Sequence, residues 1–73
     1  MNIIITISEN KNISMEVEPN TTIDKIKEFI KKSENINYGR QILSFNDRVL
    51  SEDKQIKDYN IVDNSTIVLK IKN

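Results

Sequence analysis

Apolar and polar residues alternate along the first eighteen positions, in two runs that a turn separates. The odd-numbered positions from 1 to 7 and from 13 to 17 are all apolar, and most of the positions between them are polar. Period-two alternation is typical of strands with one buried face. We therefore expect strands over 1–8 and 13–18, a turn at 9–11, and an end at Pro19, which lacks the amide donor that continues a ladder.

The next stretch has the three- and four-residue spacing of an amphipathic helix. Its apolar stripe is formed by Ile23, Ile26 and Ile30. The positions expected to face water are Lys25, Lys27, Glu28 and Lys31. Thr22 is a suitable N-cap, and Asn35 tolerates the left-handed conformation that ends many helices. The pattern predicts a helix between these two residues.

Three further strands are expected after the helix, over 40–45, 49–50 and 67–72, with a turn at 46–48. The order is β, β, α, β, β, β. A hairpin followed by one helix and more strands allows the helix to cross one face of a mixed sheet. The prediction is therefore an α+β fold of the β-grasp type.

The two strand faces and the helical stripe together predict one hydrophobic core. Burying each of its large aliphatic side chains is worth about 1.5 to 3 kcal/mol, which suffices for marginal stability. With 73 residues, we expect a single domain over 1–73. The fifteen predicted core residues are Met1, Ile3, Ile5, Ile13, Met15, Val17, Ile23, Ile26, Ile30, Leu43, Leu50, Ile56, Ile61, Ile67 and Leu69.

The composition argues against most catalytic functions. The chain has no Cys and no His, so we expect no metal site, no cofactor and no enzyme activity. Eleven basic and eleven acidic residues cancel, and no apolar stretch approaches membrane-spanning length, so neither nucleic acid nor a membrane is an expected partner. We expect a monomer located in the cytoplasm, the nucleus or both. Two pairs of carboxylates close in sequence, Glu16 with Glu18 and Glu52 with Asp53, are interpreted as solvated surface groups.

Several motifs resemble ubiquitin when they are taken together. They are Val17-Glu18-Pro19, Thr22-Ile23, Lys27, Ile30, Ile36, Gln41, Leu43, Phe45, Leu50 and Asp58-Tyr59-Asn60-Ile61. The resemblance runs without a gap from Met1 to about Lys72. It implies the ubiquitin-like β-grasp fold, ββαββ with a short extra strand and a 3-10 turn, and a Tyr59 hydroxyl bonded to the preceding loop. Asn10, Asn35, Asp47 and Asp53 stand where ubiquitin has turn glycines, and these residue types tolerate positive φ.

The resemblance also implies a binding surface on the outward face of the sheet. Three of the apolar anchors that ubiquitin presents to its receptors are polar here, which removes contacts worth about 1.5 to 3 kcal/mol each. We therefore expect ordinary ubiquitin receptors to bind poorly. The remaining aliphatics form either a shifted docking patch or an ordinary scatter of exposed apolar groups. The candidate partner-binding residues are Ile4, Ser8, Ile42, Ser44, Arg48, Val68 and Lys70.

The carboxyl end differs from that of ubiquitin. This chain ends Ile71-Lys72-Asn73, where ubiquitin has an Arg-Leu-Arg-Gly-Gly tail that is activated and conjugated. We expect a non-conjugated interaction module that links to the ubiquitin and proteasome system. Its partner is then a protein of that system or an intramolecular domain of a longer host protein. The alternative is a ubiquitin-like modifier whose Gly-Gly tail lies beyond Asn73. Lys11 and Lys27 match lysines of ubiquitin and are possible modification acceptors.

Overall fold

The computed structural model describes residues 1–72, which form five strands, one α-helix and two short 3-10 helices. The strands are β1 (Asn2–Ser8), β2 (Lys11–Glu16), β3 (Gln41–Phe45), β4 (Arg48–Val49) and β5 (Thr66–Ile71). The helices are α1 (Ile23–Glu34), η1 (Tyr38–Arg40) and η2 (Ile56–Tyr59).

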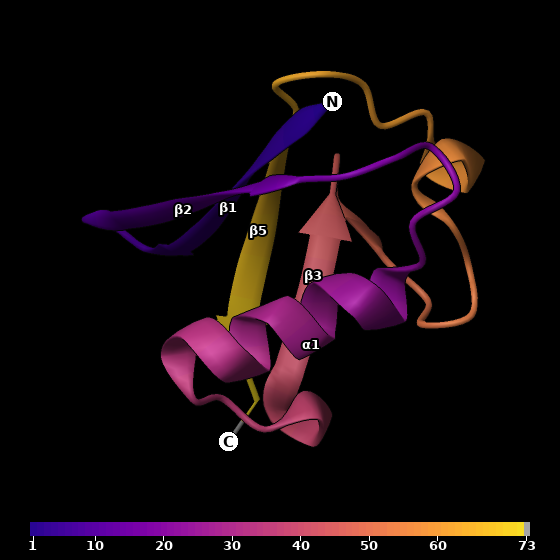
Figure 1. Cartoon of the computed structure of the whole chain (residues 1–73). Helices are drawn as coiled ribbons and strands as arrows, with labels where there is room; N and C mark the ends of the chain where they lie inside the picture. The colour runs from indigo at the N-terminus through magenta and orange to yellow at the C-terminus, as the bar shows by residue number, and fades with distance from the viewer. Residues whose placement is uncertain (73) are drawn as a thin grey trace.

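The strands form one mixed sheet in the order β2-β1-β5-β3-β4. β1 runs parallel to β5, and the other neighbours are antiparallel. α1 lies across one face of this sheet (Figure 1). A mixed sheet with a helix on one face confirms the predicted β-grasp fold and its order of elements.

Strand boundaries differ from the prediction by one or two residues. β2 begins early because Lys11 pairs with Ser8 across a register irregularity in β1. β3 begins late because η1 takes Arg40. β2 is observed over 11–16, where 13–18 was expected. β3 is observed over 41–45 instead of 40–45, and β5 over 66–71 instead of 67–72.

The ends of α1 confirm the predicted caps. Thr22 Oγ1 accepts a hydrogen bond of 3.3 Å from Lys25 N. Asn35 is left-handed, with φ 57° and ψ 41°, and its N–H donates to Lys31 O. Both ends of the helix therefore satisfy some of the backbone groups that would otherwise lack partners.

Lys27 departs from the predicted helix faces. Its side chain is buried, 8% exposed, and Nζ lies 3.1 Å from Glu52 Oε1. The segment after β4 packs along this side of α1, where Asp24 N donates to Glu52 O and Ile23 N donates to Lys54 O. A tertiary contact thus covers a position that helical spacing alone leaves in water.

The turn between β3 and β4 is shorter than predicted. Asn46 and Asp47 form a two-residue hairpin turn, with φ of 52° and 65°. Phe45 consequently pairs with Arg48. β4 therefore begins at Arg48 and ends at Val49, one residue earlier than the predicted pair 49–50.

Only part of the expectation for the turn residues is confirmed. Asn35 and Asp47 have positive φ, whereas Asn10 and Asp53 do not, so the turns at the latter two positions form without the left-handed conformation. The other left-handed residues in the described chain are Asn46, Asn60 and Asn64.

The core lies between α1 and the inner face of the sheet. Its twelve buried hydrophobic residues all belong to the predicted set. The other three predicted residues, Met1, Ile13 and Met15, are half-buried and pack against the core. Ile13 and Met15 are less buried than expected because β2 is an edge strand, which no further strand covers.

Candidate partner-binding surface

The register of the sheet places four side chains in one row across its outer face. Val68 is opposite Thr6 on β1 and Ser44 on β3, and Ser44 is opposite Val49 on β4. Residues directly opposite in neighbouring strands share a face. Leu43, next to Ser44 in the chain, is buried in the core, so the row points away from α1.

Two further pairs lie on the same face. Ile42 is opposite Lys70, and Ile4 is opposite Thr66. The exposed fraction is 67% for Val49 and 40% for Val68, and both isoleucines are partly exposed. We call the aliphatic members of these rows, Ile4, Ile42, Val49 and Val68, the outer-face patch.

Five of the predicted partner-binding residues come together on this face: Ile4, Ile42, Ser44, Val68 and Lys70. Ser8 is exposed at the end of β1, beyond the register irregularity that separates it from Thr6.

Arg48, which the sequence interpretation places at the rim of the surface, lies beside the outer-face row and not in it. It pairs with Phe45, and its guanidinium carbon lies 5.4 Å from the centroid of the Tyr59 ring. The two-residue turn is the physical reason, because it fixes a register in which Val49 points outward and Arg48 points the opposite way.

Val49 is the surface residue that the sequence interpretation missed. A signal for it is present in the sequence. Asn46-Asp47 is a residue pair suited to a two-residue turn, and this turn places Val49 opposite Ser44.

Tyr59 fixes the loop beside β4. Its hydroxyl accepts a hydrogen bond of 2.8 Å from Ser51 N. The neighbouring η2 is closed by Asp58 Oδ2, which accepts from Gln55 N at 2.8 Å. The bond to Tyr59 confirms the role that the resemblance implies, which is to hold the preceding loop.

The two possible acceptor lysines both form ion pairs. Lys11 Nζ pairs with Glu34 Oε1 and belongs to an exposed side chain. Lys27 Nζ belongs to a buried side chain and pairs with Glu52. Modification at either lysine stays a prediction, and the amine of Lys27 is the less accessible of the two.

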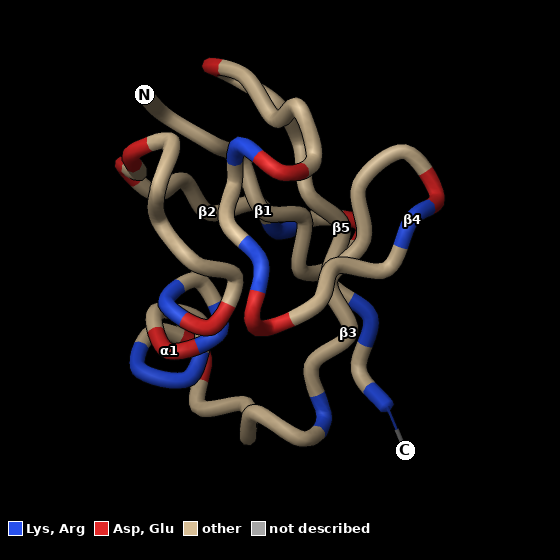
Figure 2. The backbone as a smooth tube through the Cα atoms, turned by 90° about the vertical axis from the view of Figure 1, so that its right-hand side faces the viewer, with Lys and Arg blue, Asp and Glu red and all other residues tan. Residues whose placement is uncertain are grey.

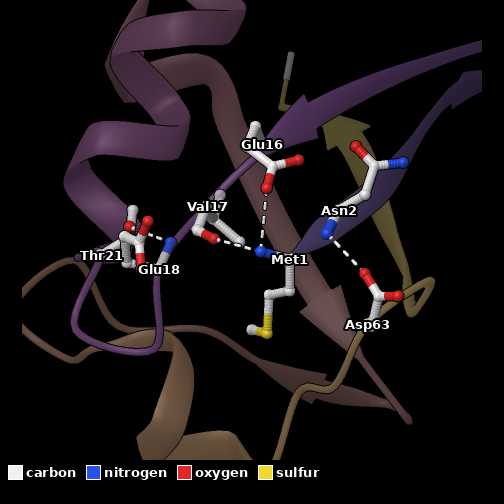
Figure 3. A network of polar contacts seen from close by, with 7 residues as sticks. All are labelled: Met1, Asn2, Glu16, Val17, Glu18, Thr21 and Asp63. Carbon is white, nitrogen blue, oxygen red and sulfur yellow. Dashed lines mark hydrogen bonds and ion pairs between the residues drawn. The ribbon is translucent and has the colours of Figure 1, made fainter.

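A polar network ties the start of β1 to both of its sides (Figure 3). The Met1 amine donates to Glu16 Oε1 at 3.0 Å and to Val17 O at 2.9 Å. Asn2 N donates to Asp63 Oδ1 at 2.6 Å. The pKa of the amine is raised above its ordinary value, chiefly by the hydrogen bond to Glu16, while burial acts in the opposite direction. These contacts secure the amino end of the strand that supplies Ile4.

Within 1–72, no three His, Cys, Asp or Glu residues are grouped so that they could hold a metal ion. No helix of this part of the chain is long and apolar enough to cross a membrane.

The sheet, the helix on its inner face and the Tyr59 anchor together define a ubiquitin-like β-grasp domain. The sequence matches the family model of the ubiquitin family over residues 3–73, and the chain belongs to this family. It is also similar to the UV excision repair protein rhp23 of Schizosaccharomyces pombe, with 31% identity over 65 residues. The matched stretch covers 89% of this chain but 18% of that protein.

Proposed function

We propose that this chain is a single ubiquitin-like domain that binds a partner protein non-covalently through the outer-face patch. The observation that carries the proposal is the row containing Val68 and Val49, two exposed aliphatics on the face that the core does not use. Aliphatic groups exposed on one face of a sheet favour association with an apolar surface of a partner.

The charge beside the patch favours a partner that also carries acidic groups. Lys70 lies opposite Ile42, and Lys72 lies next to Arg40, whose Nε donates to Lys72 O. Within residues 1–72, no ion pair involves these three cations. Figure 2 shows basic segments beside and below the β3 label, near the carboxyl end of the chain. An apolar segment flanked by carboxylates is the complementary partner.

Family membership supports a role within the ubiquitin and proteasome system. The proposed role there is binding without catalysis or conjugation, in the cytoplasm or the nucleus. The matched stretch covers only 18% of a UV excision repair protein, which supports the version of the proposal in which this domain is one part of a longer host protein. Reading the gene beyond Asn73 tests this version: a long continuation supports it, and a Gly-Gly ending contradicts it.

The binding surface is tested by titrating the isotopically labelled chain with a proteasomal receptor of ubiquitin-like domains. We expect backbone NMR shifts at Ile42, Val49 and Val68. Shifts confined to α1 contradict the proposed surface.

A ubiquitin-like modifier is the second candidate function, and the family match over residues 3–73 favours it. Incubating the complete gene product with ubiquitin-activating enzyme and ATP separates the two candidates. A thioester adduct supports the modifier, and its absence, with ubiquitin as the positive control, supports the binding module.

A further inference from the structure

A polar hollow of about 460 Å³ adjoins the outer face at the edge strand β4. Its lining residues are Arg48, Val49, Ser51, Lys54, Asp58 and Tyr59. Val49 belongs to this lining and also to the outer-face row, where it is opposite Ser44. The hollow is therefore continuous with the outer-face patch around the edge of the sheet.

The cations of the hollow are available to a ligand. Neither Arg48 nor Lys54 takes part in an ion pair within the described chain. Arg48 is also held in place, because its guanidinium lies over the Tyr59 ring and Tyr59 is itself fixed by Ser51 N. A guanidinium stacked on an aromatic ring keeps donors at its edges that fit a carboxylate.

Asp58 is the acidic side chain of the lining, and it is already engaged. Its Oδ2 accepts the hydrogen bond from Gln55 N that closes η2. The lining therefore contains two cations, Arg48 and Lys54, and one carboxylate, Asp58, which already accepts a hydrogen bond. The balance of charge in the hollow favours an incoming anion.

We infer that this hollow receives an acidic side chain of the partner segment, whose neighbouring apolar residue contacts Val49. The inference rests on the proposed function, because it treats the hollow as the end of one docking surface. It adds a specificity element: Arg48 and Lys54 select a carboxylate at one defined position of the partner.

The test uses two blocked dipeptides, N-acetyl-Leu-Glu-N-methylamide and its uncharged counterpart N-acetyl-Leu-Gln-N-methylamide. Each is titrated into the labelled chain at constant ionic strength while NMR shifts are followed. We expect the acidic peptide to shift the amides of Val49, Ser51 and Lys54 with about fivefold higher affinity than the neutral peptide. Equal affinity of the two peptides overturns the inference.

A matched pair of variants separates the hollow from general surface charge. Lys54→Gln removes a lining cation, whereas Lys57→Gln removes the same charge from a neighbouring exposed lysine outside the lining. We expect Lys54→Gln to weaken the acidic peptide about threefold or more and Lys57→Gln to leave it unchanged. Equal weakening overturns the inference.

Failure of this inference is distinguishable from failure of the proposed function. If the receptor shifts Val68 and Ile42 but the acidic peptide does not prefer the hollow, the docking face stands and the anion site is wrong. If the peptide selects the hollow while the receptor shifts α1 alone, the docking face is wrong, and the hollow is not the end of one docking surface.

Discussion

At the scale of single residues, Gln41 joins the helix to the sheet. Its buried Nε2 donates to Lys27 O and to Ile36 O, each at 3.0 Å. Its Oε1 is also buried and has no hydrogen-bond partner in the described chain. The amide therefore satisfies two carbonyls at the cost of one unsatisfied oxygen, and its two donors are the reason for its presence in the core.

Substituting Gln41 tests this interpretation. Gln41→Leu removes both donors together with the unsatisfied oxygen, and we expect a loss of about 1 to 3 kcal/mol in the free energy of unfolding. Gln41→Glu places a carboxyl group near two carbonyls, and we expect a loss of about 3 kcal/mol or more. Urea unfolding measures both variants. A Gln41→Glu variant as stable as Gln41→Leu contradicts the assignment.

The core residue Ile30 is fully buried in the apolar stripe of α1. Ile30→Ala should lower the free energy of unfolding by about 2 to 5 kcal/mol, because it removes buried groups and leaves a cavity. Val62→Ala, at a position that is 63% exposed, is the matched control and should change stability by about 0.5 kcal/mol or less. Thermal unfolding of the two variants checks this; similar midpoints would falsify the core assignment.

The Met1 amine gives stability a pH dependence in the chain that begins at Met1. Its pKa is raised in the folded state, first by the Glu16 hydrogen bond and then by the charges of Glu16, Glu18 and Asp63. The contribution is complete below the ordinary pKa of about 8 and is lost as pH rises through the folded value.

Glu16→Gln should therefore lose less stability than the native chain as pH rises from about 8 to 10. Glu9→Gln, in the exposed turn after β1, is the control and should keep the native slope. Urea unfolding at several pH values gives the comparison. Parallel curves for Glu16→Gln and the native chain contradict the origin proposed for the shift.

At the scale of elements, local patterns predicted most of the structure. Thr22 and Asn35 bound α1 as expected, because capping depends on residues a few positions apart. Lys27 was mispredicted because its burial depends on the segment after β4, which is distant in sequence. The direction of the Arg48 side chain depends on the register of β4, which the two-residue turn sets and which the sequence prediction placed one residue too late.

The hairpin between β3 and β4 yields a test of that turn. Asp47 has φ 65°, so Asp47→Gly relieves a left-handed non-glycine residue and should raise the free energy of unfolding by about 0.5 to 1 kcal/mol. Asp53 also stands where ubiquitin has glycine, but its φ is not positive. Asp53→Gly should therefore be neutral or destabilising. Calorimetric unfolding of the pair checks the difference, and an equal gain from both contradicts the turn assignment.

At the scale of the whole molecule, the two faces of the sheet differ in what they contact. The inner face and α1 hold the core, while the outer face presents Val49 and Val68 beside basic groups that form no ion pair within residues 1–72. The chain has no net charge, but three of its eleven cations, Arg40, Lys70 and Lys72, lie near the end of β5, while others lie on α1 (Figure 2). The sequence predicted the aliphatic members of this face in β1, β3 and β5. It did not predict their continuity with the hollow at β4, because that depends on the hairpin register.

Val68→Glu measures the role of the outer face most directly, with Val62→Glu as a control of equal charge at an exposed loop position. Affinity for a proteasomal receptor of ubiquitin-like domains is measured by isothermal titration calorimetry, after unfolding curves show that both variants fold. We expect Val68→Glu to weaken binding about tenfold or more and Val62→Glu to leave it unchanged. Unchanged binding by Val68→Glu, or equal weakening by both variants, contradicts an interaction module that acts through the outer-face patch.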